Sequence, residues 1–139
     1  MLPHDTVYLP IQTSYLFIIF IMTTKIYSRL DPTKLLHMIV RVGFAKNGRV
    51  DVVDPKEFLQ VAVMKHDNGK TFKAHKHIPT KKVSTICQEM WVVVEGQVFV
   101  TYYDTDDTVL EYAYINAGEI TITLAGGHNY YFTEDDTYV

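Results

Sequence analysis

A chain of 139 residues can bury the core of one domain but leaves no room for a second folding unit. Hydrophobic residues make up 47% of it and charged residues 21%, ordinary fractions for a globular protein that argue against disorder. The formal net charge of -3 gives no support for nucleic-acid binding, which needs a concentrated basic face. Cys87 is the only cysteine, so no internal disulfide can form, and we expect a cytoplasmic protein.

The N-terminal segment carries an apolar run from Tyr15 to Met22. Eight residues are far fewer than the roughly 20 that span a bilayer, so we expect no membrane segment. No basic residue precedes Lys25 and no small-residue cleavage pattern follows, which argues against a signal peptide. We therefore expect residues 1–24 to be either an extension outside the fold or an extra strand, with the domain at residues 25–139. An exposed strand of this composition would aggregate, so it would have to be covered.

From Lys25 onward, short runs rich in β-formers alternate with Gly, Asn and Asp turns, a pattern that predicts a β-sandwich or barrel. Asp31 and Pro32 can begin a short helical turn. Asn47-Gly48 predicts a two-residue hairpin between residues 42–45 and 50–53. The other predicted strands cover residues 35–42, 58–64, 71–77, 85–95, 98–103, 109–115, 120–124 and 130–132.

Two histidines in the predicted strand 71–77 stand at positions i and i+2. Because side chains alternate across a strand, His75 and His77 would point the same way and could meet one metal ion. A carboxylate, Glu89, and a third imidazole, His128, would complete a set of three nitrogens and one oxygen, which suits a borderline divalent metal. Gln88 faces the opposite side of the predicted strand, so a register shift of one would exchange it with Glu89.

The spacing around these residues resembles the cupin superfamily. Gly69, five residues and His-Lys-His match the first half of its first motif, and Glu89, six residues and Gly96 match the second half. The spacer between the halves is longer than usual, and Gly118 to His128 matches the second motif loosely. The resemblance covers roughly residues 57–139 and is closest to small single-domain cupins, which often accompany polysaccharide or nucleotide-sugar genes. It implies an all-β jelly-roll barrel.

Further residues follow the candidate ligands at strand spacing. Cys87 and Trp91 share the predicted face of Glu89, and Tyr130 and Phe132 share that of His128. If the ligands point inward, these side chains line an apolar pocket for a small molecule, although inward aromatic residues also fill any small barrel. Two basic residues on the expanded loop could reach an anionic ligand at the rim of the pocket, namely Lys81 and Lys82.

The sequence thus predicts a cupin domain with one divalent ion (Zn, Fe, Mn or Ni) that binds or acts on a small polar ligand, for which the resemblance suggests a carbohydrate or nucleotide-sugar. A metal-dependent isomerase, lyase or dioxygenase would fit. One alternative is a metal-independent sugar isomerase or epimerase with His75 as the catalytic base. Another is a non-catalytic binding or sensor module. We also expect a homodimer formed through the N-terminal half, where apolar strands exceed what a minimal barrel needs.

Overall fold

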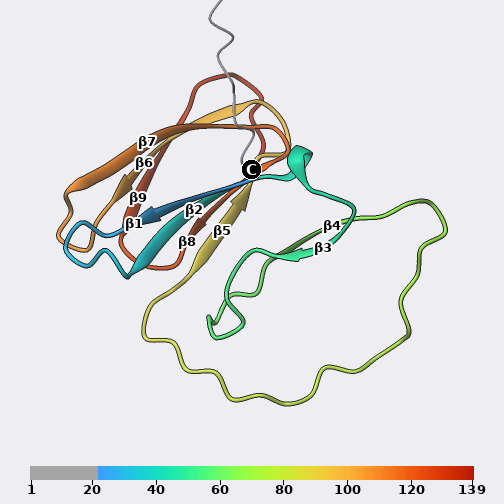
Figure 1. The fold of residues 1–139 in the computed structure, drawn as a ribbon. Helices are drawn as coiled ribbons and strands as arrows, with labels where there is room; N and C mark the ends of the chain where they lie inside the picture. Colours follow the sequence, from blue (N-terminus) through green and yellow to red (C-terminus); the bar gives the residue numbers. More distant parts are fainter. Residues whose placement is uncertain (1–21) are drawn as a thin grey trace, which may run out of the picture.

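The computed structural model describes residues 22–139, which form nine strands in three antiparallel sheets (Figure 1). The all-β class expected from the sequence is confirmed, because the only helix in the described residues is a 3-10 turn at Val42–Phe44. The strands are β1 (Thr23–Tyr27), β2 (Leu35–Arg41), β3 (Gly48–Asp51), β4 (Ala62–Lys65), β5 (Glu89–Val92), β6 (Gln97–Tyr103), β7 (Val109–Asn116), β8 (Glu119–Thr123) and β9 (Gly127–Phe132).

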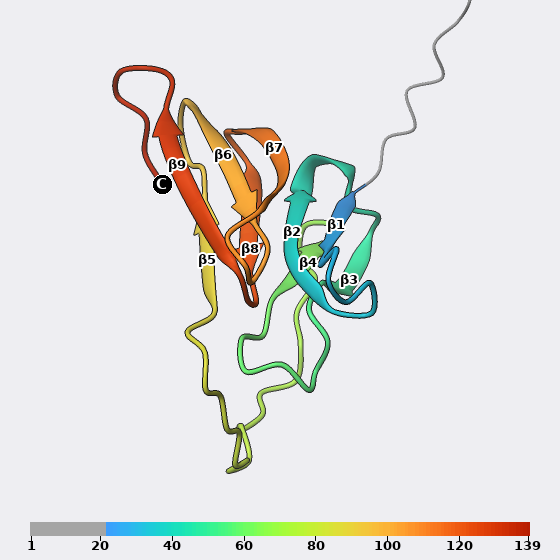
Figure 2. The same ribbon diagram turned by 90° about the vertical axis from the view of Figure 1, so that its left-hand side faces the viewer.

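Two of the sheets lie face to face. One has the strand order β1-β2-β8-β5 and the other β7-β6-β9, while β3 and β4 form a separate pair (Figure 2). Within residues 22–139 no strand pairing joins the two larger sheets, so the arrangement is that of a β-sandwich and the expected closed barrel is not formed. Among the described strands β5 and β9 each pair on one side only, and β5 directly follows the long loop.

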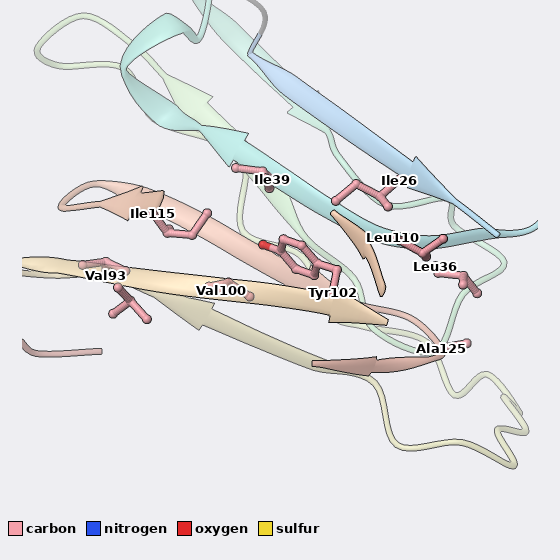
Figure 3. Close-up of a cluster of buried hydrophobic side chains, with 10 residues drawn as sticks. Ile26, Leu36, Ile39, Val93, Val100, Tyr102, Leu110, Ile115 and Ala125 are labelled. Atoms are coloured by element: carbon pink, nitrogen blue, oxygen red, sulfur yellow. The ribbon is translucent and has the colours of Figure 1, made fainter. Parts of the chain in front are cut away.

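The main core fills the space between the two larger sheets (Figure 3). β6 shows how its sequence builds this core, because its burial alternates residue by residue and Val98, Val100 and Tyr102 all point inward. Ile115 of β7 lies beside Val98 in the same sheet, and Ile39 of β2 joins the cluster from the other sheet. The Ser28 hydroxyl, 2.8 Å from Asp104 Oδ1, ties the end of β1 to the turn after β6.

A second core lies between the outer side of the four-stranded sheet and the β3–β4 pair. Here Val53 and Val63 cover Met38 and Ile122. The hairpin expected at Asn47-Gly48 is wrong, since residues 42–44 form the 3-10 turn and β3 pairs with β4 instead. Burial of apolar residues against the sheet decided this pairing, whereas the local turn signal did not.

The chain between β4 and β5 makes a long excursion without strands (Figure 1). The strand predicted at residues 71–77 is therefore not formed, and those predicted at 58–64 and 85–95 shorten to β4 and β5. All residues from 66 to 81 are exposed, so no apolar face of this segment is buried and no neighbouring strand satisfies its backbone. The helical turn expected after Asp31 is a hydrogen-bonded turn only.

The predicted strands at 35–42, 98–103, 109–115, 120–124 and 130–132 are confirmed with small changes in their bounds. β1 begins at Thr23, inside the segment expected to be an extension or extra strand, and the apolar run at 15–21 lies outside the described residues. No helix in the described part of the chain is long and apolar enough to cross a membrane.

Candidate functional site

Glu89 and His128 meet between the two larger sheets. Glu89 is the first residue of β5 in one sheet, and His128 is the second residue of β9 in the other. The Glu89 Oε2 atom lies 3.3 Å from His128 Nε2. The histidine side chain is 18% exposed and the carboxylate 47%, so the pair sits at a solvent-accessible margin of the interior. Two of the four predicted ligands are thus brought together from residues 39 positions apart in the sequence.

Strand register explains the surroundings of this pair. Thr123 of β8 lies opposite His37 of β2 on one side and opposite Glu89 on the other. Side chains directly opposite on one face of a sheet are about 5 Å apart, so these three form a row across the sheet. Thr123 Oγ1 lies 3.2 Å from His37 Nδ1 and 3.0 Å from His128 Nδ1. The row therefore continues into the second sheet through His128.

The directions of the hydrogen bonds in this row follow from one fixed acceptor. His37 Nε2 lies 2.9 Å from the carbonyl oxygen of Tyr103, which can only accept, so Nε2 carries a hydrogen. Desolvation by burial lowers the pKa of His37, so the ring is neutral near pH 7 and its Nδ1 is an acceptor. Thr123 therefore donates to His37 Nδ1, and its oxygen accepts from His128 Nδ1.

The reverse orientation of the Thr123 hydroxyl is unfavourable. It would leave Nδ1 of His37, a fully buried residue, without a donor. An unsatisfied buried group of this kind costs about 1–3 kcal/mol. With its hydrogen held on Nδ1, a neutral His128 turns the lone pair of Nε2 toward the Glu89 carboxylate. Two acceptors at this distance repel each other, and a cation bound between the two atoms would turn this repulsion into attraction.

Gly126 makes the anchor of this row sterically feasible. Its φ is +80°, and a Cβ at this position would lie 2.5 Å from the Tyr103 carbonyl oxygen and 3.2 Å from His37 Nε2. A side chain would therefore press on the hydrogen bond that sets the tautomer of His37. This accounts physically for the glycine two residues before His128.

Aromatic rings lie beside the pair. Trp91 stacks on Tyr130 with ring centroids 4.1 Å apart and an interplanar angle of 11°, and Tyr130 is 4.7 Å from the ring of His128. Desolvation by burial raises the pKa of Tyr130 well above its ordinary value, and that of Tyr102 to about 12. Both phenols are therefore neutral over the physiological range and present hydroxyl groups rather than charge to the interior.

The other predicted pocket residues lie further out. Cys87 is exposed on the loop before β5, and Phe132, four residues beyond His128 along β9, is 46% exposed. The side chain of Gln88 points away from the pair, because its amide donates to Glu57 Oε2 at 2.6 Å. Gln88 also borders a hollow of about 710 Å3 on the opposite side of the sheet. Glu89, and not Gln88, is thus the residue directed at His128.

The two histidines of the His-Lys-His motif lie on the exposed loop. Their rings stack with centroids 5.7 Å apart, and His75 Nδ1 is 3.2 Å from the carbonyl oxygen of Lys73. Among residues 22–139 no group of three or more His, Cys, Asp or Glu side chains converges as a metal site would require. The structure therefore brings His75 and His77 together, but not with Glu89 and His128.

The two lysines predicted at the rim differ. Lys81 is exposed, whereas Lys82 Nζ donates to the carbonyl oxygens of Pro55, at 3.1 Å, and Glu57, at 2.6 Å. Lys82 thus holds the loop against the segment before β4, which is a structural role.

Sequence reasoning missed His37 and Thr123. The available signal was a histidine inside the apolar run of 35–42, a position where a polar ring must find partners. In comparisons with known proteins, no protein-family model, no curated protein and no solved structure matches the chain. The function is therefore inferred from the chemistry of these side chains.

Proposed function

We propose that the chain is a metal-binding domain of the cupin type that binds a small polar ligand between its two larger sheets. The observation that supports this is the lone pair of His128 Nε2, directed at the Glu89 carboxylate by the hydrogen bonds from Tyr103 through His37 and Thr123. An imidazole nitrogen and a carboxylate oxygen are both ligands for borderline divalent metals. A tautomer held by a hydrogen bond to the other ring nitrogen is the usual arrangement for a metal-binding histidine.

The separation of the two atoms fits this proposal. Ligand atoms about 2.1 Å from a tetrahedral zinc ion are about 3.4 Å from each other. The distance from Glu89 Oε2 to His128 Nε2 is 3.3 Å. The same pair without metal forms an ordinary ion pair when His128 is protonated, so protons and metal compete for one place.

His75 and His77 are proposed as the two further ligands. His77 stands twelve residues before Glu89, and an extended segment of that length spans up to about 40 Å. The loop can therefore carry both imidazoles to the pair without moving β5, provided that Lys82 releases its hydrogen bonds to Pro55 and Glu57. Among residues 22–139 no strand pairs with the outer edge of β9, next to His128, so this edge can accept a further strand.

The metal, when bound, would supply a Lewis acid or, if it is iron, a centre for dioxygen chemistry. The residues of the chain would do the rest. Trp91 and Tyr130 would offer apolar ring surface to the ligand, while the Tyr130 hydroxyl is held by Thr121. A carbohydrate or nucleotide-sugar, with both apolar and hydroxyl-bearing surfaces, fits these groups.

Use of His75 as a metal-independent base is less well supported. A general base needs a partner that orients it, and within residues 22–139 the His75 ring makes one hydrogen bond, to the Lys73 carbonyl on the exposed loop. A non-catalytic sensor would use the same metal site and differ only in lacking turnover.

Metal content tests the proposal. We expect about one divalent ion per chain after purification without chelator, and loss of most of it in His128→Ala, Glu89→Gln and the double variant His75→Ala/His77→Ala. His66→Ala is the matched control, because His66 is an exposed histidine of the same loop outside the motif.

Two results would separate the alternatives. Full metal content in both His128→Ala and Glu89→Gln would refute the metal site. Loss in these two but not in the double loop variant would keep the site and remove His75 and His77 from it.

A further inference from the structure

The outward side of the β7-β6-β9 sheet carries no charged residue. Strand register arranges its nine central side chains in three rows across the sheet. We call this surface the outer aromatic face; its rows are Asn116–Gln97–Thr133, Tyr114–Phe99–Tyr131 and Tyr112–Thr101–Asn129. Thr133 lies one residue beyond β9, and its backbone N–H donates to the Gln97 carbonyl oxygen. Charged residues make up 21% of the chain, and the solvent side of an antiparallel sheet is ordinarily polar. A neutral face of nine residues with four rings therefore needs an explanation.

The rings of this face are held in place but remain accessible. Tyr114 is 56% exposed and Tyr131 is 68% exposed. Phe99 lies between them on the middle strand and contacts Tyr114 with ring centroids 5.0 Å apart. Exposed aromatic groups that are contiguous, unlike scattered ones, commonly mark a binding surface.

The face is hollowed at its centre. A depression of about 400 Å3 is lined by Phe99, Thr101, Tyr114, Asn129, Tyr131 and Thr133. Three of these are aromatic and three carry neutral hydroxyl or amide groups. Thr133 is engaged, since its hydroxyl donates to the Gln97 carbonyl oxygen at 3.0 Å. The side chains of Thr101 and Asn129 make no hydrogen bond within residues 22–139, so both are available to a ligand.

We propose that this hollow binds a neutral hexose oligosaccharide. A sugar ring has a face of C–H groups, polarised by the neighbouring oxygens, which suits the negative face of an aromatic ring. Its hydroxyl groups lie at the edge of the ring, where Thr101, Asn129 and the tyrosine hydroxyls can donate and accept. The hollow also matches a neutral sugar in charge. Its lining has no ionic side chain that could offset the negative charge of a phosphate or a carboxylate.

Two other occupants fit the hollow less well. Single-stranded nucleic acid also stacks on aromatic residues of a sheet, but it requires basic side chains for its phosphates, and none lines the hollow. A second copy of the chain would have to satisfy the amide of Asn129 and the tyrosine hydroxyls across a desolvated contact, at a cost for each group left unpaired.

This site is independent of the proposed metal site. In β9, His128 and Tyr130 point between the sheets, whereas Asn129 and Tyr131 point outward. Substitutions on one side can therefore be tested without touching the other.

Titration of the full chain with maltohexaose, cellohexaose and mannohexaose, followed by two-dimensional NMR, tests the proposal. At about 10 mM sugar, which detects millimolar dissociation constants, at least one of the three should shift the resonances of Tyr114, Asn129 and Tyr131. We expect Tyr114→Ala and Tyr131→Ala to weaken binding about tenfold or more, while Tyr131→Phe keeps most of it. The matched control Tyr27→Ala, at a tyrosine of β1 that is 42% exposed in the other large sheet, should bind as the unaltered chain does.

Absence of shifts at the hollow with all three sugars would overturn the proposal. It would also be overturned if light scattering showed a dimer that Tyr131→Ala converts to a monomer, because the face would then be an interface between two copies. Equal binding by Tyr131→Ala and the unaltered chain would place the sugar elsewhere.

Discussion

Replacing Thr123 by valine removes the hydroxyl group that connects the two histidines. Valine has nearly the same volume, and Thr123 is 5% exposed, so packing is largely retained. What is lost are the two hydrogen bonds of the threonine oxygen, to His37 at 3.2 Å and to His128 at 3.0 Å. Thr123→Ser is the matched control, because it keeps the hydroxyl and loses only a methyl group.

The expected magnitude follows from the burial of each partner. His37 is fully buried, so its Nδ1 is left unsatisfied at a cost of about 1–3 kcal/mol. His128 is partly exposed and can turn to water, so losing its bond costs about 0.5–1.5 kcal/mol. We therefore expect Thr123→Val to lower the free energy of unfolding by about 2–4 kcal/mol. Thr123→Ser should lower it by about 1 kcal/mol, the contribution of one buried methyl group.

Three measurements check this reasoning. Urea unfolding without metal gives the two free energies of unfolding. Nitrogen chemical shifts of the imidazoles report whether His128 keeps its hydrogen on Nδ1. If the metal site exists, zinc affinity should fall about 10–100-fold in Thr123→Val and remain near its original value in Thr123→Ser. Equal stability of the two variants, with the His128 tautomer unchanged in both, would refute the role assigned to Thr123.

The other predictions concern the surroundings of this row. Gly126→Ala should lower the free energy of unfolding by about 1–3 kcal/mol more than Gly118→Ala. Both glycines have a φ of +80°, but only at Gly126 would a Cβ press against a carbonyl oxygen. Equal losses of the two variants in urea unfolding would contradict this prediction. Burial lowers the pKa of His37 below its ordinary value of 6.5, so as the pH falls the unfolded chain takes up a proton on His37 before the folded chain does. The free energy of unfolding should therefore decrease as the pH falls below 6.5. Comparing unfolding at about pH 7.5 and about pH 5.5 checks this, and a His37→Asn variant with the same pH slope would argue against the assignment. Tyr130→Leu should shift the fluorescence emission of Trp91, the only tryptophan, to longer wavelength. It should also lower the free energy of unfolding by about 0.5–1.5 kcal/mol more than the loss of buried apolar area alone. Unchanged emission would mean that the two rings do not stack in solution.

The C-terminal half of the fold was predictable from local patterns. β6 reads Gln-Val-Phe-Val-Thr-Tyr-Tyr, and its alternation predicts which side chains face the core. The Asp turn between β6 and β7 joins two strands that pair directly, whereas β7 and β8, joined by a still shorter turn, lie in different sheets. Glycines with positive φ, such as Gly96 and Gly118, mark the turns.

The N-terminal half was less predictable because its turn signals did not decide which segments pair. The Asn47-Gly48 signal describes two residues, whereas the pairing of β3 with β4 depends on burying Val63 against a sheet formed by distant strands. The strand expected at 71–77 shows the same limit, since the pattern of the segment suits a strand but no neighbour pairs with it in residues 22–139.

The residue types of the candidate site were visible in the sequence, because Glu89, His128, Trp91 and Tyr130 stand at strand spacing near glycine turns. Their partners were not. His37 and Thr123 are 86 positions apart, and only the register of β2 against β8 places them opposite each other. Side chains alternate along a strand with a period of two, so the local sequence sets which face of the strand each side chain occupies. Which residues of other strands that side chain contacts depends on the pairing and packing of whole sheets, and that is settled only when the chain has buried its apolar surface.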